Sequence, residues 1–156
     1  LRTEGDIEQI SEREKVVEEE EIRGGDETIL LVDDEDIQLD TGQDILGQCG
    51  YTTITAGSGE EAIEVYEREG DRIALVIMDV GMPGMGGHRC LQELLKINLE
   101  AKVIITSGYS PIGKVKETLE AGAAGFIGKP YHLIDMLKKV RKVLDKRQAY
   151  KFVESG

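Results

Sequence analysis

The chain of 156 residues has no tryptophan, two phenylalanines, three prolines and two cysteines. Cys49 and Cys90 stand alone, without the C-x-x-C spacing of a metal or redox site. No apolar run approaches the roughly 20 residues that span a bilayer, and the N-terminus lacks the basic and apolar regions of a signal peptide. We therefore expect a cytoplasmic domain that makes no membrane contact itself.

A basic surplus is also absent, since the formal net charge is −12. Residues 1–27 carry 11 acids and 4 bases, whereas residues 28–156 carry 20 acids and 15 bases. This composition predicts an acidic linker or solvated helix over 1–27, in which Ile7, Ile10 and Val17 could form a weak homodimer seam. The basic run at 138–147 is expected to be the solvated face of a helix, with no nucleic acid as partner.

From residue 28 onward, short β-branched runs alternate with segments of helical period. We expect strands at 28–32, 51–55, 73–78, 102–106 and 124–128, each followed by a helix. Ser58 with Glu61 predicts a capping box, and Ser110 before Pro111 predicts another helix start. The fold class is therefore α/β, a doubly wound five-stranded parallel sheet with helices on both faces.

Polar residues stand where the predicted strands end. They are Asp33 and Asp34 after the first strand, Asp79 after the third, Thr106 at the end of the fourth and Lys129 after the fifth. Open parallel sheets bind ligands at the carboxyl ends of their strands, so these side chains should meet in one crevice. Three carboxylates there suit Mg²⁺, which prefers hard oxygen ligands.

The residue types also suggest a chemistry. In-line phosphoryl transfer needs a positioned nucleophile, a metal and a further cation. Asp79 is the expected nucleophile, Lys129 the cation that pairs with the phosphoryl oxygens, and Thr106 a hydroxyl donor to one of them. Asp33, Asp34 and Asp79 are the expected metal ligands, and the backbone carbonyl of Gly81 could complete the set.

Four segments in this order, "LLVDDED", "VIMDVGMPGMGG", "VIITSGYS" and "GAAGFIGKP", resemble the receiver domain of two-component response regulators. The resemblance covers about residues 28–147, leaving 148–156 as a C-terminal tail. It implies a flavodoxin-like strand order 2-1-3-4-5, Mg²⁺ near Asp34 and Asp79, and phosphorylation of Asp79. It also implies a cis Lys129–Pro130 bond, and it places Phe126 where the family often carries an aromatic switch residue, with core packing as the alternative.

The same resemblance implies a phosphohistidine donor, either a histidine kinase or a histidine phosphotransfer protein. The C-terminal receiver of a hybrid sensor kinase, tethered to a membrane-bound parent, is the expected context, and a stand-alone regulator is the alternative. A pseudo-receiver that binds partners without phosphorylation is the main rival function. A Mg²⁺-dependent phosphatase of the haloacid dehalogenase type fits less well, because it needs an acid where this chain has Gly81.

Overall fold

The computed structural model describes residues 23–108 and 112–146. Within them, helices and strands alternate along the chain. In order they are β1 (Thr28–Val32), α2 (Asp36–Gln48), β2 (Thr52–Ala56), α3 (Gly59–Glu69), the 3₁₀ turn η1 (Gly70–Arg72), β3 (Ile73–Asp79), α4 (Gly86–Ile97), β4 (Val103–Ser107), α5 (Ile112–Glu120), β5 (Gly125–Gly128) and α6 (Leu133–Asp145). The five predicted strands are confirmed, and every strand end lies within one residue of its predicted position.

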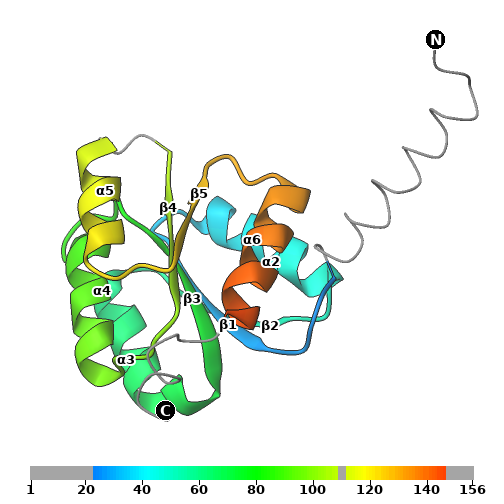
Figure 1. The fold of residues 1–156 in the computed structure, drawn as a ribbon, viewed down its shortest axis with the longest axis horizontal. Coiled ribbons are helices and arrows are strands. Elements are labelled where there is room, and N and C mark those ends of the chain that lie inside the picture. The colour runs from blue at the N-terminus through cyan, green and yellow to red at the C-terminus, as the bar shows by residue number, and fades with distance from the viewer. Residues whose placement is uncertain (1–22, 109–111, 147–156) are drawn as a thin grey trace, which may run out of the picture.

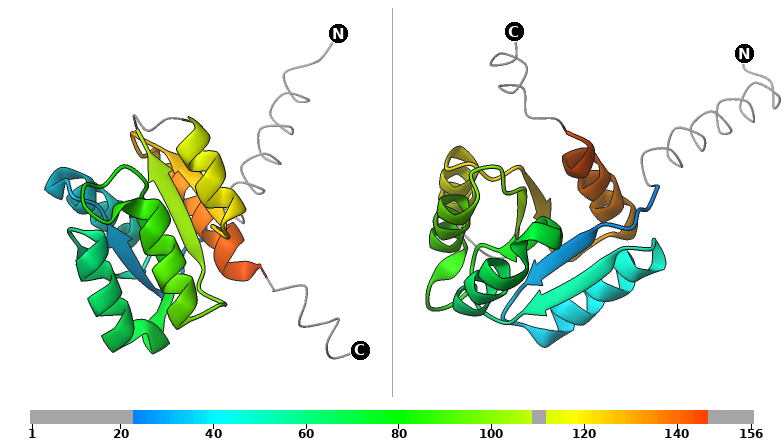
Figure 2. Two further views of the ribbon diagram at one scale, coloured as in Figure 1. Left: turned by 90° about the vertical axis from the view of Figure 1, so that its left-hand side faces the viewer. Right: turned by 90° about the horizontal axis from the view of Figure 1, so that it is seen from below.

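The five strands form one parallel sheet in the order β2-β1-β3-β4-β5. Helices α3, α4 and α5 cover one face and α2 and α6 cover the other, as Figure 1 and the turned views of Figure 2 show. The predicted fold class and strand order are therefore confirmed. None of the described helices combines the length and apolar character that a bilayer span requires.

The three central strands, β1, β3 and β4, contribute alternate residues to two separate cores, because successive side chains point to opposite faces of a sheet. In β3, Val76 and Met78 pack under α3 and α4, whereas Leu75 and Ile77 pack under α2 and α6. A strand that is buried on both faces has a nearly continuous run of apolar residues in its sequence, and β3 has such a run before Asp79.

The helix ends follow their local sequence. Ser58 Oγ accepts a hydrogen bond from the Glu61 amide, as the capping box predicts, and the Glu61 carboxylate accepts from the Gly57 amide. Gly50 and Gly122 adopt positive φ angles of 92° and 121° just after helices, where L side chains are disfavoured. The helix start predicted at Ser110 and Pro111 lies outside the described residues.

Candidate functional site

The strand-end residues lie on one face of the sheet because they share the alternation of the strands that carry them. Ile29 and Leu31 of β1 face α2 and α6, so Asp33 continues that series. In the same way, Asp79 lies two residues after Ile77, Thr106 two after Ile104 and Lys129 two after Ile127, and these three isoleucines belong to the same core. The predicted side chains therefore come together at the carboxyl edge of the sheet, on the side covered by α2 and α6.

The central pair of this edge is Asp79 and Thr106, which are register partners on the adjacent strands β3 and β4. The Val80 amide donates to the Thr106 carbonyl at 2.9 Å, and the Lys129 amide donates to the Ser107 carbonyl at 3.1 Å. These backbone hydrogen bonds continue the ladder past the strand ends and fix the positions of the side chains. The Lys129–Pro130 peptide bond is cis, as expected.

Asp33, Asp34 and Asp79 form an acidic cluster in which one carboxylate oxygen of each lies within 4.8 Å of the others. Asp33 is 2% exposed and Asp79 is 7% exposed, whereas Asp34 faces solvent. Three carboxylates so close repel one another strongly, and a divalent cation would relieve this repulsion. Their oxygens are also the donors that Mg²⁺ prefers, so the residues fit such an ion.

Lys129 supplies the positive charge within the cluster. Its Nζ lies 2.6 Å from Asp33 Oδ2 and 3.3 Å from Asp79 Oδ2, and its side chain is 10% exposed. Burial acts to lower the pKa of Lys129, but the hydrogen bond and charge of Asp33 and the charge of Asp79 outweigh it and raise the pKa. Burial raises the pKa of Asp33, and the contact with Lys129 opposes that shift. Lys129 is therefore charged at neutral pH.

Two tight turns hold the acids in place. The Gly81 amide donates to Asp79 Oδ1 at 3.0 Å, and the Glu35 amide donates to Asp33 Oδ1 at 3.0 Å. Each side chain thus receives a backbone hydrogen bond from two residues further on, the Asx turn typical of aspartate. These bonds leave the other oxygen of each carboxylate directed at Lys129.

The loop after Asp79 needs a glycine where α4 begins. A Cβ on Gly87 would lie 2.6 Å from the Asp79 carbonyl oxygen and 2.6 Å from Val80 Cα. The Gly87 amide donates to the Val80 carbonyl at 3.2 Å. The start of α4 therefore packs directly on the backbone that carries Asp79, which a larger residue would push away.

Thr106 is completely buried, and its Oγ1 has no hydrogen-bond partner among the described residues. A polar neighbour is the half-buried Tyr131, which sequence reasoning did not single out. Burial raises the pKa of the Tyr131 hydroxyl and the adjacent Thr106 hydroxyl opposes that shift, although the pair lacks the geometry of a well-formed hydrogen bond. The Thr106 hydroxyl is thus a donor without an acceptor on the strand beside Asp79.

Two expectations about the neighbouring surface need correction. Phe126 is not part of either buried core, since this residue of the edge strand β5 is 37% exposed. The basic run at 138–147 is not simply a solvated face, since the Arg141 side chain is 11% exposed and pairs with Glu27. A charge run marks a helix surface, but it does not show which neighbouring segment covers that surface.

The comparisons with known proteins agree with this geometry. The family model described as "Response regulator receiver domain" matches residues 29–141. The chain is 36% identical over 118 residues to the chemotaxis protein CheY of Thermotoga maritima, covering 73% of this chain and 97% of that protein. It is 36% identical over 138 residues to the sensor kinase CckA of Brucella abortus, covering 88% of this chain but 15% of the kinase.

Solved structures give the same result. The CheX–CheY–BeF3–Mg²⁺ complex from Borrelia burgdorferi matches with 33% identity and a TM-score of 0.73, covering 77% of this chain and 90% of that one. A CheY-like receiver domain from Methanospirillum hungatei matches with 31% identity and a TM-score of 0.72, covering 78% and 95%. On the sequence, the fold and the acidic edge of the sheet, this chain belongs to the response regulator receiver domain family of two-component signalling.

Proposed function

We propose that this receiver domain accepts a phosphoryl group on Asp79 and thereby changes which partner it binds. The observation that supports the proposal most strongly is the position of Asp79, whose Oδ2 lies 3.3 Å from Lys129 Nζ inside a cluster of three carboxylates. An acid placed beside both a fixed cation and further acids suits a nucleophile whose phosphorylated product carries extra negative charge.

The transfer step needs little covalent work from the protein. A carboxylate oxygen of Asp79 forms a bond to phosphorus while the bond from phosphorus to the donor imidazole nitrogen breaks. The electron pair of that bond stays on the imidazole nitrogen, which takes a proton. Lys129 then pairs with an oxygen of the new phosphoryl group, so it exchanges a carboxylate partner for a phosphoryl partner.

Magnesium is the cofactor that we propose for this step. Asp33, Asp34 and Asp79 would hold it, with the Gly81 carbonyl as a further ligand. The bound ion would neutralise charge on the phosphoryl oxygens and relieve the repulsion among the carboxylates. The Borrelia CheY complex with BeF3 and Mg²⁺ supports the assignment, because its matching chain shares 33% identity and the fold with this one.

Thr106 is the proposed switch residue. Its buried hydroxyl has no hydrogen-bond partner in the described part of the chain, and it stands on the strand next to Asp79. A phosphoryl oxygen on Asp79 would give this hydroxyl an acceptor and draw the end of β4 toward the site. Phe126 on the neighbouring strand β5 is exposed, so a shift of β4 would move an exposed aromatic surface that we propose as a partner contact.

The proposed partners are a histidine kinase or a histidine phosphotransfer protein, since receiver domains in general act with these proteins. The matches to CckA and to CheY support two contexts, a receiver within a hybrid histidine kinase and a stand-alone regulator. The chain spans 15% of the first and nearly all of the second. A pseudo-receiver function is less well supported, because the acids, the lysine and the threonine are all present.

Intact mass measured before and after incubation with acetyl phosphate and Mg²⁺ tests the proposal. We expect the wild type to gain one phosphoryl group and Asp79→Asn to gain none while keeping its circular dichroism spectrum. Asp44→Asn is the matched control, because Asp44 is an exposed aspartate on α2 and should leave the gain unchanged. Equal gains in wild type and Asp79→Asn would refute the assignment, and no gain in a folded wild type would favour the pseudo-receiver.

A further inference from the structure

A groove of about 950 Å³ runs along β5 and α6, next to the acidic cluster, and Lys129 both lines the groove and contacts the cluster. Its walls carry the apolar ring of Phe126 and more cations than acids. The acids are Asp135 and Asp145, and the cations are Arg23, Lys129, Lys138, Lys139, Arg141 and Lys142. We call this surface the basic groove.

Several of these cations already have acidic partners. Lys129 pairs with the acidic cluster, and Arg23 and Arg141 both pair with Asp145 at the end of α6. In the described part of the chain, no acid forms an ion pair with Lys139 or Lys142. The basic groove therefore has unbalanced positive charge on α6 beside an exposed aromatic ring.

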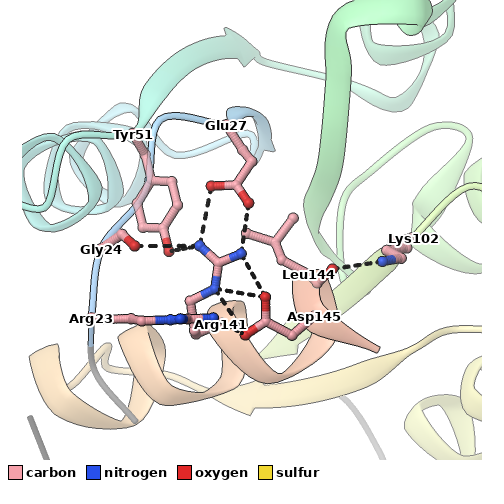
Figure 3. Close-up of polar contacts among 8 residues, drawn as sticks. All are labelled: Arg23, Gly24, Glu27, Tyr51, Lys102, Arg141, Leu144 and Asp145. Atoms are coloured by element: carbon pink, nitrogen blue, oxygen red, sulfur yellow. Dashed lines mark hydrogen bonds and ion pairs between the residues drawn. The ribbon is translucent and has the colours of Figure 1, made fainter. Parts of the chain in front are cut away.

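Residues 23–27 join the groove to the N-terminal part of the chain. The Arg141 guanidinium donates to both Glu27 oxygens, at 3.1 and 2.6 Å, and to the Tyr51 hydroxyl at 3.3 Å (Figure 3). On the same helix, Asp145 accepts from Arg23 at 2.6 Å. The Gly25 amide also donates to the Cys49 carbonyl. These contacts fix Arg23 at the edge of the groove. Residue 22, which precedes it in the chain, is therefore attached at the groove.

The preceding segment has the complementary charge. Residues 1–22 contain nine acids and three bases, with four consecutive glutamates at 18–21. They also contain apolar residues, among them Ile7, Ile10 and Val17, that could cover the Phe126 ring. We propose that this acidic segment, residues 1–22, docks into the basic groove of its own receiver domain. This inference goes beyond the proposed phosphorylation, because it assigns an intramolecular ligand to a second surface.

The tether makes such docking favourable even if each contact is weak. Because the segment is part of the same chain, its effective concentration at the groove is on the order of millimolar, so a millimolar intrinsic affinity already occupies about half of the molecules. The attraction is between exposed charges, which salt screens over a Debye length of about 8 Å at physiological ionic strength. Docking should therefore weaken as salt rises, and it should cover Phe126 while it lasts.

Paramagnetic relaxation measured on the full chain tests the docking. A nitroxide is attached at Ser11→Cys in a Cys49→Ser background. Cys90 can stay, because it is completely buried and burial raises the pKa of its thiol to about 12, which leaves it unreactive. We expect the label to broaden amide signals of β5 and α6 at low salt, and 0.5 M NaCl to restore them.

Matched charge variants locate the contact. Lys139→Glu with Lys142→Glu should abolish the broadening. Lys96→Glu with Lys116→Glu changes the net charge equally on α4 and α5 and should leave it unchanged. A mixture of ¹⁵N-labelled unmodified chain with unlabelled spin-labelled chain should show no broadening. The proposal is overturned if the full chain shows no broadening, or if the broadening persists in the Lys139→Glu, Lys142→Glu variant. Broadening in the mixture would also overturn it, because the occupant of the groove would then be a second copy of the chain.

Discussion

Lys129 Nζ lies 2.6 Å from Asp33 Oδ2, closer than it lies to the proposed phosphoacceptor. In this state the lysine is held mainly by the acid at the end of β1, and its 3.3 Å contact with Asp79 is the weaker one. Phosphorylation of Asp79 would add charge on the weaker side and so draw the ammonium across the site. Lys129 therefore both neutralises the resting cluster and can respond to its modification.

Removing this cation should destabilise the metal-free domain. Lys129→Met leaves Asp33 and Asp79 as buried carboxylates without their cation, at a cost of about 3 kcal/mol in the free energy of unfolding. Mg²⁺ should restore part of the loss, because it neutralises the same acids. Urea denaturation with and without MgCl₂ measures both effects. Lys96→Met is the control, since the ion pair of Lys96 is exposed and should contribute under about 1 kcal/mol. Equal stability of Lys129→Met and wild type without Mg²⁺ would contradict this account.

Asp34→Ala should weaken Mg²⁺ binding without harming the fold. Its carboxylate belongs to the acidic cluster but faces solvent, so its loss removes a ligand charge and no core packing. We expect the dissociation constant for Mg²⁺ to rise about tenfold or more, measured by calorimetric titration. Asp44→Ala, an exposed aspartate outside the cluster, should bind Mg²⁺ as the wild type does. An unchanged constant in Asp34→Ala would show that Asp34 is not a ligand.

Gly108→Leu should lengthen the lifetime of the phosphoaspartate by excluding water. Gly108 has no positive φ, and a Cβ there would lie 3.6 Å from Lys129 Cβ, an ordinary contact. The backbone at this position therefore accepts a Cβ, and a leucine would stand two residues after Thr106, beside the lysine that would hold the phosphoryl group. The measurement is phosphate release after removal of the donor. Gly47→Leu, whose Cβ would meet nothing within 4 Å, is the control. If Gly108→Leu and wild type lose phosphate equally fast, access at this position does not limit hydrolysis.

The contact between Glu27 and Arg141 should make stability depend on pH in the acid range. Hydrogen bonds from Arg141 lower the pKa of Glu27 below its usual 4.5. A lowered carboxyl pKa gives stabilisation that is fully present above pH 4.5 and is lost as pH falls through the folded-state value. Arg141→Met should therefore lower the free energy of unfolding by about 2 kcal/mol near pH 7 and by less at pH 3. Glu27→Gln should remove the part of this pH dependence that comes from Glu27, whereas the part from Asp145, whose pKa is also lowered by hydrogen bonds from Arg141, should remain. The measurement is the free energy of unfolding of both proteins from pH 7 to pH 3. If the difference between Arg141→Met and wild type stays constant over this range, the contact is not the source of the pH dependence.

Much of the site was predictable because it depends on short-range patterns. The period of two within each strand and the polar residue at each strand end determine that Asp33, Asp79, Thr106 and Lys129 share one edge. Once the strands alternate with helices, the parallel order places those ends together. The assignment of chemical roles to these residues, and of Gly81 as a ligand, stays a prediction until it is measured.

Contacts between distant segments were not predictable in the same way. Arg141 sits in a basic run, and nothing local indicates that Glu27, 114 positions earlier, would receive its guanidinium. Likewise, the exposure of Phe126 depends on the position of β5 at the edge of the sheet, and the strand order of the whole sheet sets that position. The domain boundary predicted at residue 28 marks the start of β1, but residues 23–27 already pack on α6 through these contacts. The segments 1–22 and 148–156 lie outside the described residues.

The location of the phosphoryl group tests the central claim most directly. The wild-type chain is phosphorylated with acetyl phosphate and Mg²⁺, reduced with borohydride to convert acyl phosphate to homoserine, and digested for peptide sequencing by mass spectrometry. The account predicts homoserine at position 79 when Mg²⁺ is present, and none there when Mg²⁺ is removed by chelation. Modification at Asp33 or Asp34 instead, or equal modification of Asp79 without Mg²⁺, would contradict it.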